Sequence, residues 1–186
     1  MKDKYDRRSQ RTRHLVGEAF VQLLKEKGYS AITVSDIIER ANIGRSTFYS
    51  HYRDKDDLFV AQLDRVIEML SHHMPTQGDI PFFPSLGLFR HVGEEYELYK
   101  AIVWTPGIDL FVKHLQTSLS HRIEDGLRKG DNAFDIPLPI VANFIAGSFL
   151  TLLKWWLENK MNYSPEEMDK IFRRLTLAGI ETMKTN

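Results

Sequence analysis

The residues best suited to chemistry form a short polar set, Arg45, Ser46 and Thr47, at the predicted start of a short helix. An arginine fork pairs with guanine O6 and N7 in the major groove of duplex DNA, and hydroxyl groups bond to bases or phosphates. Phe48 and Tyr52 are four residues apart, so they share one helix face and are expected to pack inward. This division into a polar face and an aromatic face predicts a helix that reads DNA.

Other kinds of chemistry find little support. Cysteine is absent, which excludes thiolate metal sites and cysteine nucleophiles. The five histidines between residues 72 and 121 suggest a metal site, but His114 and His121 would lie about 10 Å apart along one helix, and no carboxylate falls in a recognised ligand spacing. We find no nucleophile–base set, phosphate loop or paired carboxylates. We therefore expect no metal, no cofactor and no enzymatic activity.

The composition is that of a globular protein, and the N-terminal part of the chain, residues 1–56, is basic. Of 186 residues, 42% are hydrophobic and 27% are charged, which fits one domain or a small module fused to a larger one. Residues 1–56 carry 12 Lys and Arg against 8 Asp and Glu, which leaves 13 against 17 for residues 57–186. This basic part suggests a polyanionic partner, although a solvated helix face would give the same count.

Helical periodicity runs through almost the whole chain, and no useful strand pattern is present, so we expect an all-α fold. An apolar stripe over residues 15–24 predicts a first helix that ends at Gly28. Thr33 and Asp36 form a capping-box pattern that starts a second helix. The remaining helices are expected over residues 45–52, about 55–73, 86–103, 108–129, 138–160 and 165–184, with a Pro-containing loop at 74–85.

The segment TVSDIIERANIGRSTFYSHYRDKDDLF, residues 33–59, resembles the helix-turn-helix signature of TetR/AcrR-type transcriptional regulators. The resemblance covers about residues 10–60 and continues beyond them only in helical layout and length. It implies a helix-turn-helix module at residues 1–54 and an effector-binding and dimerisation domain at 55–186. Asn42 stands where the family commonly has Gly and is expected to serve the left-handed turn. Gly44 stands where a capping Ser or Thr is common, which weakens the start of the third helix.

The same resemblance implies that the third helix enters the major groove of a pseudo-palindromic operator in double-stranded DNA. Arg45 is expected to contact a base, and Thr47 a base methyl group or a phosphate. Thr33 is expected to be both a cap and a phosphate donor. The predicted DNA-binding residues are Thr33, Arg45, Ser46, Thr47, Tyr49, His51 and Lys55.

The basic N-terminus has two open interpretations. Its cations are Lys2, Lys4, Arg7, Arg8, Arg11 and Arg13. They could follow the phosphate backbone or enter the minor groove as an arm, or they could belong to a solvated, frayed terminus.

A helix-turn-helix reads only a few base pairs, so we expect a homodimer. The family resemblance points to the last two predicted helices, which are rich in apolar and small residues, as the interface. The alternative is that both helices simply form the core of the monomer. The predicted interface residues are Phe149, Leu153, Trp156, Ile171, Phe172 and Leu175.

The middle of the chain has more large aromatic residues than a small bundle needs, which suits an apolar pocket with a few polar groups, although ordinary core packing is the alternative. The predicted pocket residues are Phe89, Tyr96, Tyr99, Trp104, Phe111, His114, Phe144 and Trp155. By resemblance we expect a repressor that a small, largely apolar effector releases from DNA. The alternative function is an all-α small-molecule binding protein without operator control.

One uncharged stretch, residues 136–153, is a candidate membrane segment by composition. Pro137 and Pro139 belong at a helix start, and the fully apolar part is too short to span a bilayer. The basic N-terminus is not followed by an apolar run of signal-peptide type. We therefore expect a buried helix, no membrane association and a cytoplasmic protein.

Overall fold

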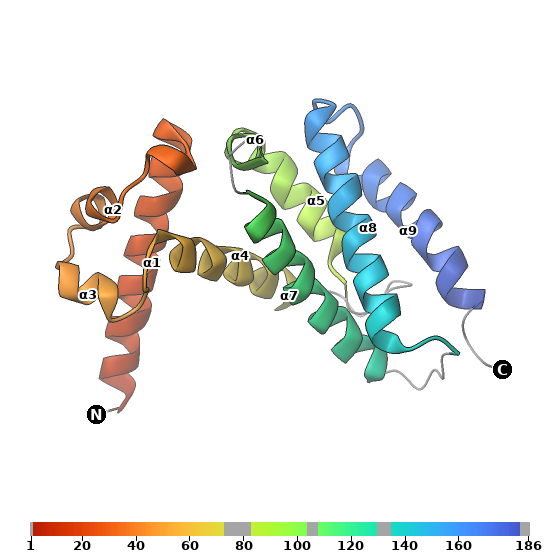
Figure 1. Ribbon diagram of the computed structural model, residues 1–186, viewed down its shortest axis with the longest axis horizontal. Helices are drawn as coiled ribbons and strands as arrows, with labels where there is room; N and C mark the ends of the chain where they lie inside the picture. The colour runs from red at the N-terminus through yellow and green to blue at the C-terminus, as the bar shows by residue number, and fades with distance from the viewer. Residues whose placement is uncertain (1, 73–82, 104–107, 130–134, 183–186) are drawn as a thin grey trace. The chain divides into compact units, whose positions relative to one another are not determined.

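The computed structural model describes residues 2–72, 83–103, 108–129 and 135–182 and contains two compact units (Figure 1). The first unit comprises residues 1–63 and 97–108, and the second comprises residues 64–96 and 109–186. Every regular element in the described ranges is a helix, which confirms the all-α prediction. The division between the units lies inside α4 (Lys55–His72), nine residues after the boundary that the sequence suggested at residue 54.

The first unit is built on α1 (Lys2–Lys27), which begins well before the predicted start at residue 15. Its buried face carries Val16, Ala19, Phe20, Leu23 and Leu24, the stripe that predicted the helix. The ring of Phe20 packs 5.7 Å from that of Phe59 on α4. The short 3-10 turn η1 (Tyr29–Ala31) follows α1. The helix-turn-helix is then completed by α2 (Val34–Ala41), α3 (Arg45–Tyr49) and the first part of α4. Most of α6 (Tyr96–Val103) also belongs to this unit.

The turn between α2 and α3 has the predicted chemistry. The Thr33 side chain accepts a hydrogen bond from the Asp36 backbone, and the Asp36 carboxylate accepts one from the Thr33 backbone, so the capping box is complete. Asn42 adopts the left-handed conformation with φ 50°, as expected. Gly44 gives α3 no side-chain cap, and α3 ends at Tyr49, three residues before its predicted end. Residues 50–52 instead form a turn in which the amides of His51 and Tyr52 donate to the Phe48 carbonyl.

The second unit contains the rest of α4, α5 (Ser85–Glu94), α7 (Ile108–Arg128), α8 (Leu138–Glu158) and α9 (Pro165–Thr182). The single helix predicted over residues 86–103 is wrong, because it breaks at Glu95 into α5 and α6. Gly93 has a low helix propensity, and the carboxylates of Glu94 and Glu95 oppose the helix dipole at a C-terminus, so the chain favours a break here.

An aromatic cluster forms the core of the second unit. The ring of Phe149 on α8 lies 4.8 Å from Phe83, 5.0 Å from Phe89 and 5.3 Å from Phe172. Trp156 adds an edge contact with Phe89 at 5.5 Å. Ser85 donates a hydrogen bond to the buried Asp169 carboxylate, which ties α5 to α9. Aromatic pairs in such tilted and edge-on arrangements add to the stabilisation from burial.

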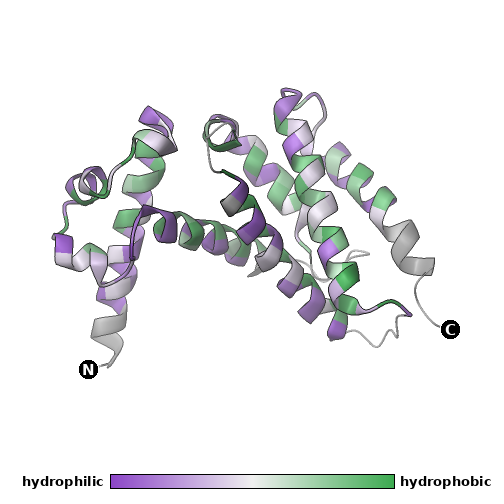
Figure 2. Cartoon of the chain, viewed as in Figure 1, coloured by the Kyte–Doolittle hydropathy of each residue, from purple (hydrophilic) through white to green (hydrophobic). Residues whose placement is uncertain are grey.

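Helix α8 is long and apolar enough to span a membrane, by length and composition alone. Its inner face, however, is buried in the unit, with Ala142, Ile145, Ala146 and Phe149 at most 1% exposed. Figure 2 shows hydrophobic colour on many turns of α8. Burial accounts for the apolar residues of the inner face. The outer face, which the sequence also predicted to be buried, is exposed at Ile140, Phe144 and Trp155.

The left-handed turn at Asn42 sets a stability prediction. Asn42→Gly should leave the free energy of unfolding within a few tenths of a kcal/mol, whereas Asn42→Ala should lower it by about 1 kcal/mol, because a Cβ without a polar head is strained at this φ. Urea unfolding followed by circular dichroism measures both. Equal stabilities for the Ala and Gly variants would contradict the assignment.

Candidate nucleic-acid interface

Helix α3 presents the predicted two faces. Phe48 is 0% exposed, and its ring packs 5.6 Å from that of Tyr52, which is also buried. Arg45 and Ser46 are exposed and Tyr49 is 49% exposed, whereas Thr47 is half-buried. A short helix with a buried aromatic back and a polar first turn can lay its front side chains against base edges in a major groove.

Arg45 is held at the junction of the two helices. One of its Nη2 hydrogens is donated to Ser35 Oγ on α2 over 3.1 Å, and the side chain remains exposed. Because a guanidinium has five N–H groups, this single bond leaves enough donors for bidentate pairing with a guanine. Ser35 was not among the predicted site residues; it lies in the first turn of α2, about two turns before the break at Asn42.

The role of Thr33 as a phosphate donor is not supported. Its hydroxyl lies 2.7 Å from Asp36 Oδ2, so its one hydrogen is directed to that carboxylate. Asp36 is also ion-paired with Lys27 at 2.8 Å, and these bonds hold the pKa of its carboxyl far below the usual range. A phosphate at Thr33 would face this ionised carboxylate, so Thr33 is a cap alone.

Lys55 is drawn into the protein rather than presented to solvent. Its Nζ donates to the carbonyl oxygens of Tyr29 at 3.1 Å and Ile32 at 3.0 Å and lies 4.4 Å from the centre of the Tyr29 ring. Asp56 and Asp57 occupy the first turn of α4, where their charges already complement the helix dipole. The expected phosphate contact at this helix start is therefore disfavoured. The acidic residues on both sides of Lys55 in the run DKDD, residues 54–57, would also repel a phosphate.

His51 lies just after α3 and is half-buried. Burial, together with the positive charge of Arg13, lowers the pKa of His51 and so favours the neutral imidazole, which offers one N–H donor. A phosphate oxygen beside it would favour the protonated form and raise its pKa.

Three predicted dimer-interface residues are buried within their own chain. Phe149 and Trp156 are each 1% exposed, so they cannot contact a second copy, and their assignment to the interface is wrong. Phe172 is equally buried and offers only a small surface at the floor of a groove between α8 and α9. Leu175 is 70% exposed, and Leu153 and Ile171 are partly exposed. The alternative that α8 and α9 form the monomer core holds for their inner faces.

Two predicted pocket residues lie on the outer surface instead. Phe144 is 57% exposed and Trp155 is 44% exposed on α8. Both line an apolar groove of about 510 Å³ between α8 and α9, which we call the α8/α9 groove. Phe144 and Trp155, which were predicted to line an inner pocket, thus lie on the outer surface of α8, because a helix that is apolar all round gives no sign of which face is inside. The groove is lined by Phe144, Ser148, Thr151, Leu152, Trp155, Tyr163, Met168, Ile171, Phe172, Leu175 and Thr176.

The other predicted pocket residues have varied surroundings. Phe89 belongs to the closed aromatic core, Phe111 is buried, and Tyr96 and Tyr99 are half-buried. Trp104 lies outside the described residues. No sign in the sequence pointed to the polar link that holds His114: its Nε2 lies 3.2 Å from Asp64 Oδ2 on α4, and Ser118 donates to Asp64 Oδ1 over 2.8 Å.

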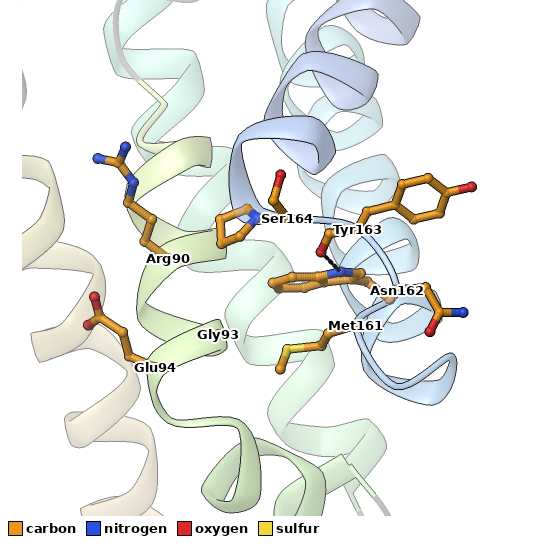
Figure 3. Close-up of a pocket in the computed structure, with 9 residues that line it drawn as sticks. Arg90, Gly93, Glu94, Met161, Asn162, Tyr163 and Ser164 are labelled. Atoms are coloured by element: carbon orange, nitrogen blue, oxygen red, sulfur yellow. Dashed lines mark hydrogen bonds between the residues drawn. The ribbon is translucent and has the colours of Figure 1, made fainter.

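A second cavity, of about 490 Å³, lies where the turn after α8 passes α5 (Figure 3). Arg90 and Glu94 line it from α5, and Met161 and Asn162 line it from the turn. The Trp156 indole donates to the Tyr163 carbonyl over 2.9 Å, the dashed line in Figure 3, and Arg90 is ion-paired with Glu166 at 2.8 Å. In the described part of the chain no three His, Asp or Glu side chains gather in a way that could hold a metal ion.

Comparison with known proteins matches both parts of the chain. Residues 18–61 match the sequence profile of bacterial regulatory proteins of the tetR family, and residues 85–177 match that of a transcriptional regulator C-terminal region. The HTH-type regulator YxbF of Bacillus subtilis is 41% identical over 70 residues, which is 37% of this chain and 18% of that protein. The dhaKLM operon activator DhaS of Lactococcus lactis is 35% identical over 95 residues, or 49% of this chain and 48% of DhaS. The chain thus aligns with less than half the length of these relatives.

Solved structures match over almost the whole chain. A TetR transcriptional regulator from Streptococcus agalactiae is 29% identical with a TM-score of 0.64, covering 95% of this chain and 99% of that one. The structure of DhaS shares the fold at 22% identity and a TM-score of 0.63, covering 94% of this chain and 98% of DhaS.

The environment of His51 predicts a pH effect. In the free protein NMR titration of the imidazole should give a pKa below 6.5, and a bound duplex should raise it because a phosphate oxygen favours the imidazolium. The duplex should consequently bind more tightly at pH 6 than at pH 7.5, and His51→Gln should weaken this dependence. A His51 pKa that is unchanged by DNA would contradict the contact.

Proposed function

Because the chain belongs to the TetR family of bacterial regulatory proteins, we propose that it controls transcription as a homodimer that binds a pseudo-palindromic operator and responds to a small, largely apolar effector. The observation that carries the DNA-binding part is the exposure of Arg45, Ser46 and Tyr49 around the fully buried Phe48. Since one such helix reads only a few base pairs, two copies related by two-fold symmetry are needed for useful specificity.

The second copy is proposed to dock on the α8/α9 groove. Phe144, Trp155 and Leu175 expose large apolar surfaces there, and Ile140 on the same helix as Phe144 is 60% exposed. A contiguous exposed apolar surface of this kind is typical of an interaction site. We therefore propose Ile140, Phe144, Trp155, Ile171 and Leu175 as interface residues, and Leu153, which is partly exposed, remains a candidate.

The effector is proposed to act by preferring the arrangement of the dimer that does not fit the operator. Only the difference between its affinities for the two arrangements shifts the equilibrium. Two proteins that share this fold are described with ligands that carry a large apolar part: FadR of Bacillus subtilis with stearoyl-CoA, whose acyl chain is apolar and whose coenzyme A part is charged, and SmeT with triclosan. These support an effector with a large apolar part, and Tyr96 and Phe111 of the second unit remain candidates to contact it.

We propose repression as the direction of control. A dimer on an operator that overlaps a promoter excludes the polymerase, and release by an effector then induces transcription. DhaS, by its name, is an activator, so a promoter–reporter fusion in cells with and without the protein decides the direction.

Arg45→Ala should remove specific DNA binding while the fold persists. An operator duplex is first selected from a random pool with the wild-type protein, and fluorescence anisotropy then measures both variants. We expect a loss of about 1–3 kcal/mol per half-site and relaxed preference at one base position, because the variant lacks the fork that pairs with guanine. Stearoyl-CoA and triclosan are then added to the wild-type complex to test release.

Arg128→Ala, at the exposed end of α7, is the matched control for loss of one arginine. It should bind the operator as the wild type does. Unchanged operator affinity in Arg45→Ala would contradict the proposed reading helix and favour a small-molecule binding protein without operator control.

Phe144→Glu should separate the proposed dimer. A charge in the α8/α9 groove would have to be buried against apolar surface, so we expect the dimer dissociation constant to rise by roughly 100-fold, or about 2.7 kcal/mol. Analytical ultracentrifugation at micromolar concentration measures it. Val112→Glu, which replaces a residue 38% exposed on α7, serves as the control. A Phe144→Glu variant that remains dimeric would reject this interface.

A further inference from the structure

The positive charge of residues 1–56, which we call the reading unit, is concentrated at its N-terminus. Residues 1–14 contain six Lys and Arg against two Asp, a net charge of +4. Residues 15–56 contain six Lys and Arg against six Asp and Glu, a net charge of zero. The excess of residues 1–56 therefore comes from the first fourteen residues alone.

The cations in the body of the reading unit are already engaged. Lys27 pairs with Asp36 at 2.8 Å, Arg40 with Glu26 at 2.7 Å and Arg53 with Asp57 at 2.8 Å. Lys55 is bonded to two carbonyl oxygens. Arg45 is bonded to a neutral hydroxyl. This pairing leaves the helix-turn-helix body with little free positive charge for phosphates.

None of residues 7–15, whose side chains the structure describes, is buried, and Val16 follows them as a buried residue of α1. Residues 2–14, which we call the α1 overhang, form about 20 Å of helix. Arg8, Arg11 and Arg13 are exposed. Arg8 and Arg11 are three residues apart, so they lie on one face, whereas Arg13, two residues after Arg11, lies on another face of the same helix. In the view of Figure 1 the overhang continues past the level of α3.

The base of the overhang lies near the predicted DNA surface. Arg13 is close enough to His51, just after α3, to lower the pKa of that imidazole. Two neighbouring donors of this kind repel each other when both are charged, and a phosphate between them would relieve the repulsion.

We propose that the α1 overhang is a second contact with the duplex, in which Arg8, Arg11 and Arg13 bind backbone phosphates while α3 reads the bases. The proposal rests on the proposed function. The helical form of the overhang argues against insertion between bases or into the minor groove, because a helix of about 10–12 Å diameter is too wide for a groove of about 6 Å. The overhang therefore contributes affinity for any sequence, and α3 contributes discrimination.

The test compares the full-length wild type with Arg8→Ala/Arg11→Ala. Anisotropy gives the dissociation constants for the selected operator duplex and for a scrambled duplex of equal length, from 50 to 300 mM KCl. Loss of two phosphate contacts per protomer should weaken binding to both duplexes by the same factor, at least ten-fold near 0.1 M salt. The slope of log affinity against log salt should fall by about 1.8 per protomer, about 0.9 for each contact.

The control is Arg128→Ala/Lys129→Ala, which removes two exposed cations from the end of α7. Circular dichroism verifies that each variant is as helical as the wild type. If the overhang variant matches this control in affinity and salt slope while the wild type still prefers the operator, the overhang contact is rejected and the proposed function stands. A loss confined to the operator would mean that these arginines read bases, which also overturns the proposal. A wild type that binds neither duplex would reject the proposed function itself.

Discussion

The burial of Phe48 is the constraint on which the reading surface depends. Helix α3 has five residues and no side-chain cap, so its own hydrogen bonds cannot hold it in water. Full burial of a phenylalanine is worth about 1.5–3 kcal/mol, and the ring contact with Tyr52 fixes its orientation. Because Phe48 must point inward, Arg45, Ser46 and Tyr49 point outward. The position of one apolar side chain thus determines which side chains can face DNA.

Local sequence patterns were sufficient to predict the turn that positions α3. The Thr33 and Asp36 pair and the left-handed Asn42 depend on neighbours within a few residues, so the sequence predicts them and the structure has them. Roles that depend on a distant partner could not be predicted in this way. Lys55 is withdrawn by carbonyl groups 23 and 26 residues away. His114 is held by Asp64, fifty residues earlier in the chain, and no periodicity in either helix indicates that pairing.

The sequence of helix α8 likewise does not reveal which of its faces is buried. Its apolar character predicted burial, yet the pairs Phe144 with Trp155 and Phe149 with Trp156 look equivalent in the sequence. The structure separates them, because Phe149 and Trp156 meet Phe89 while Phe144 and Trp155 remain exposed. Periodicity identifies an inner face only when the outer face is polar. An outer face that is also apolar is informative once the fold is known, since it marks a surface that a partner can cover.

The charged residues of the reading unit have a different role from its packed apolar residues. Ion pairs such as Lys27 with Asp36 and Arg40 with Glu26 fasten α1 to α2 and leave the helix-turn-helix body electrically neutral. A neutral body gains less from counterion release, so shape and hydrogen bonds to bases and phosphates contribute more to its contacts with DNA. A cationic α1 overhang placed outside the packed core can then adjust affinity without disturbing α3. Separating the two tasks in this way keeps residues that select a sequence distinct from residues that bind any sequence.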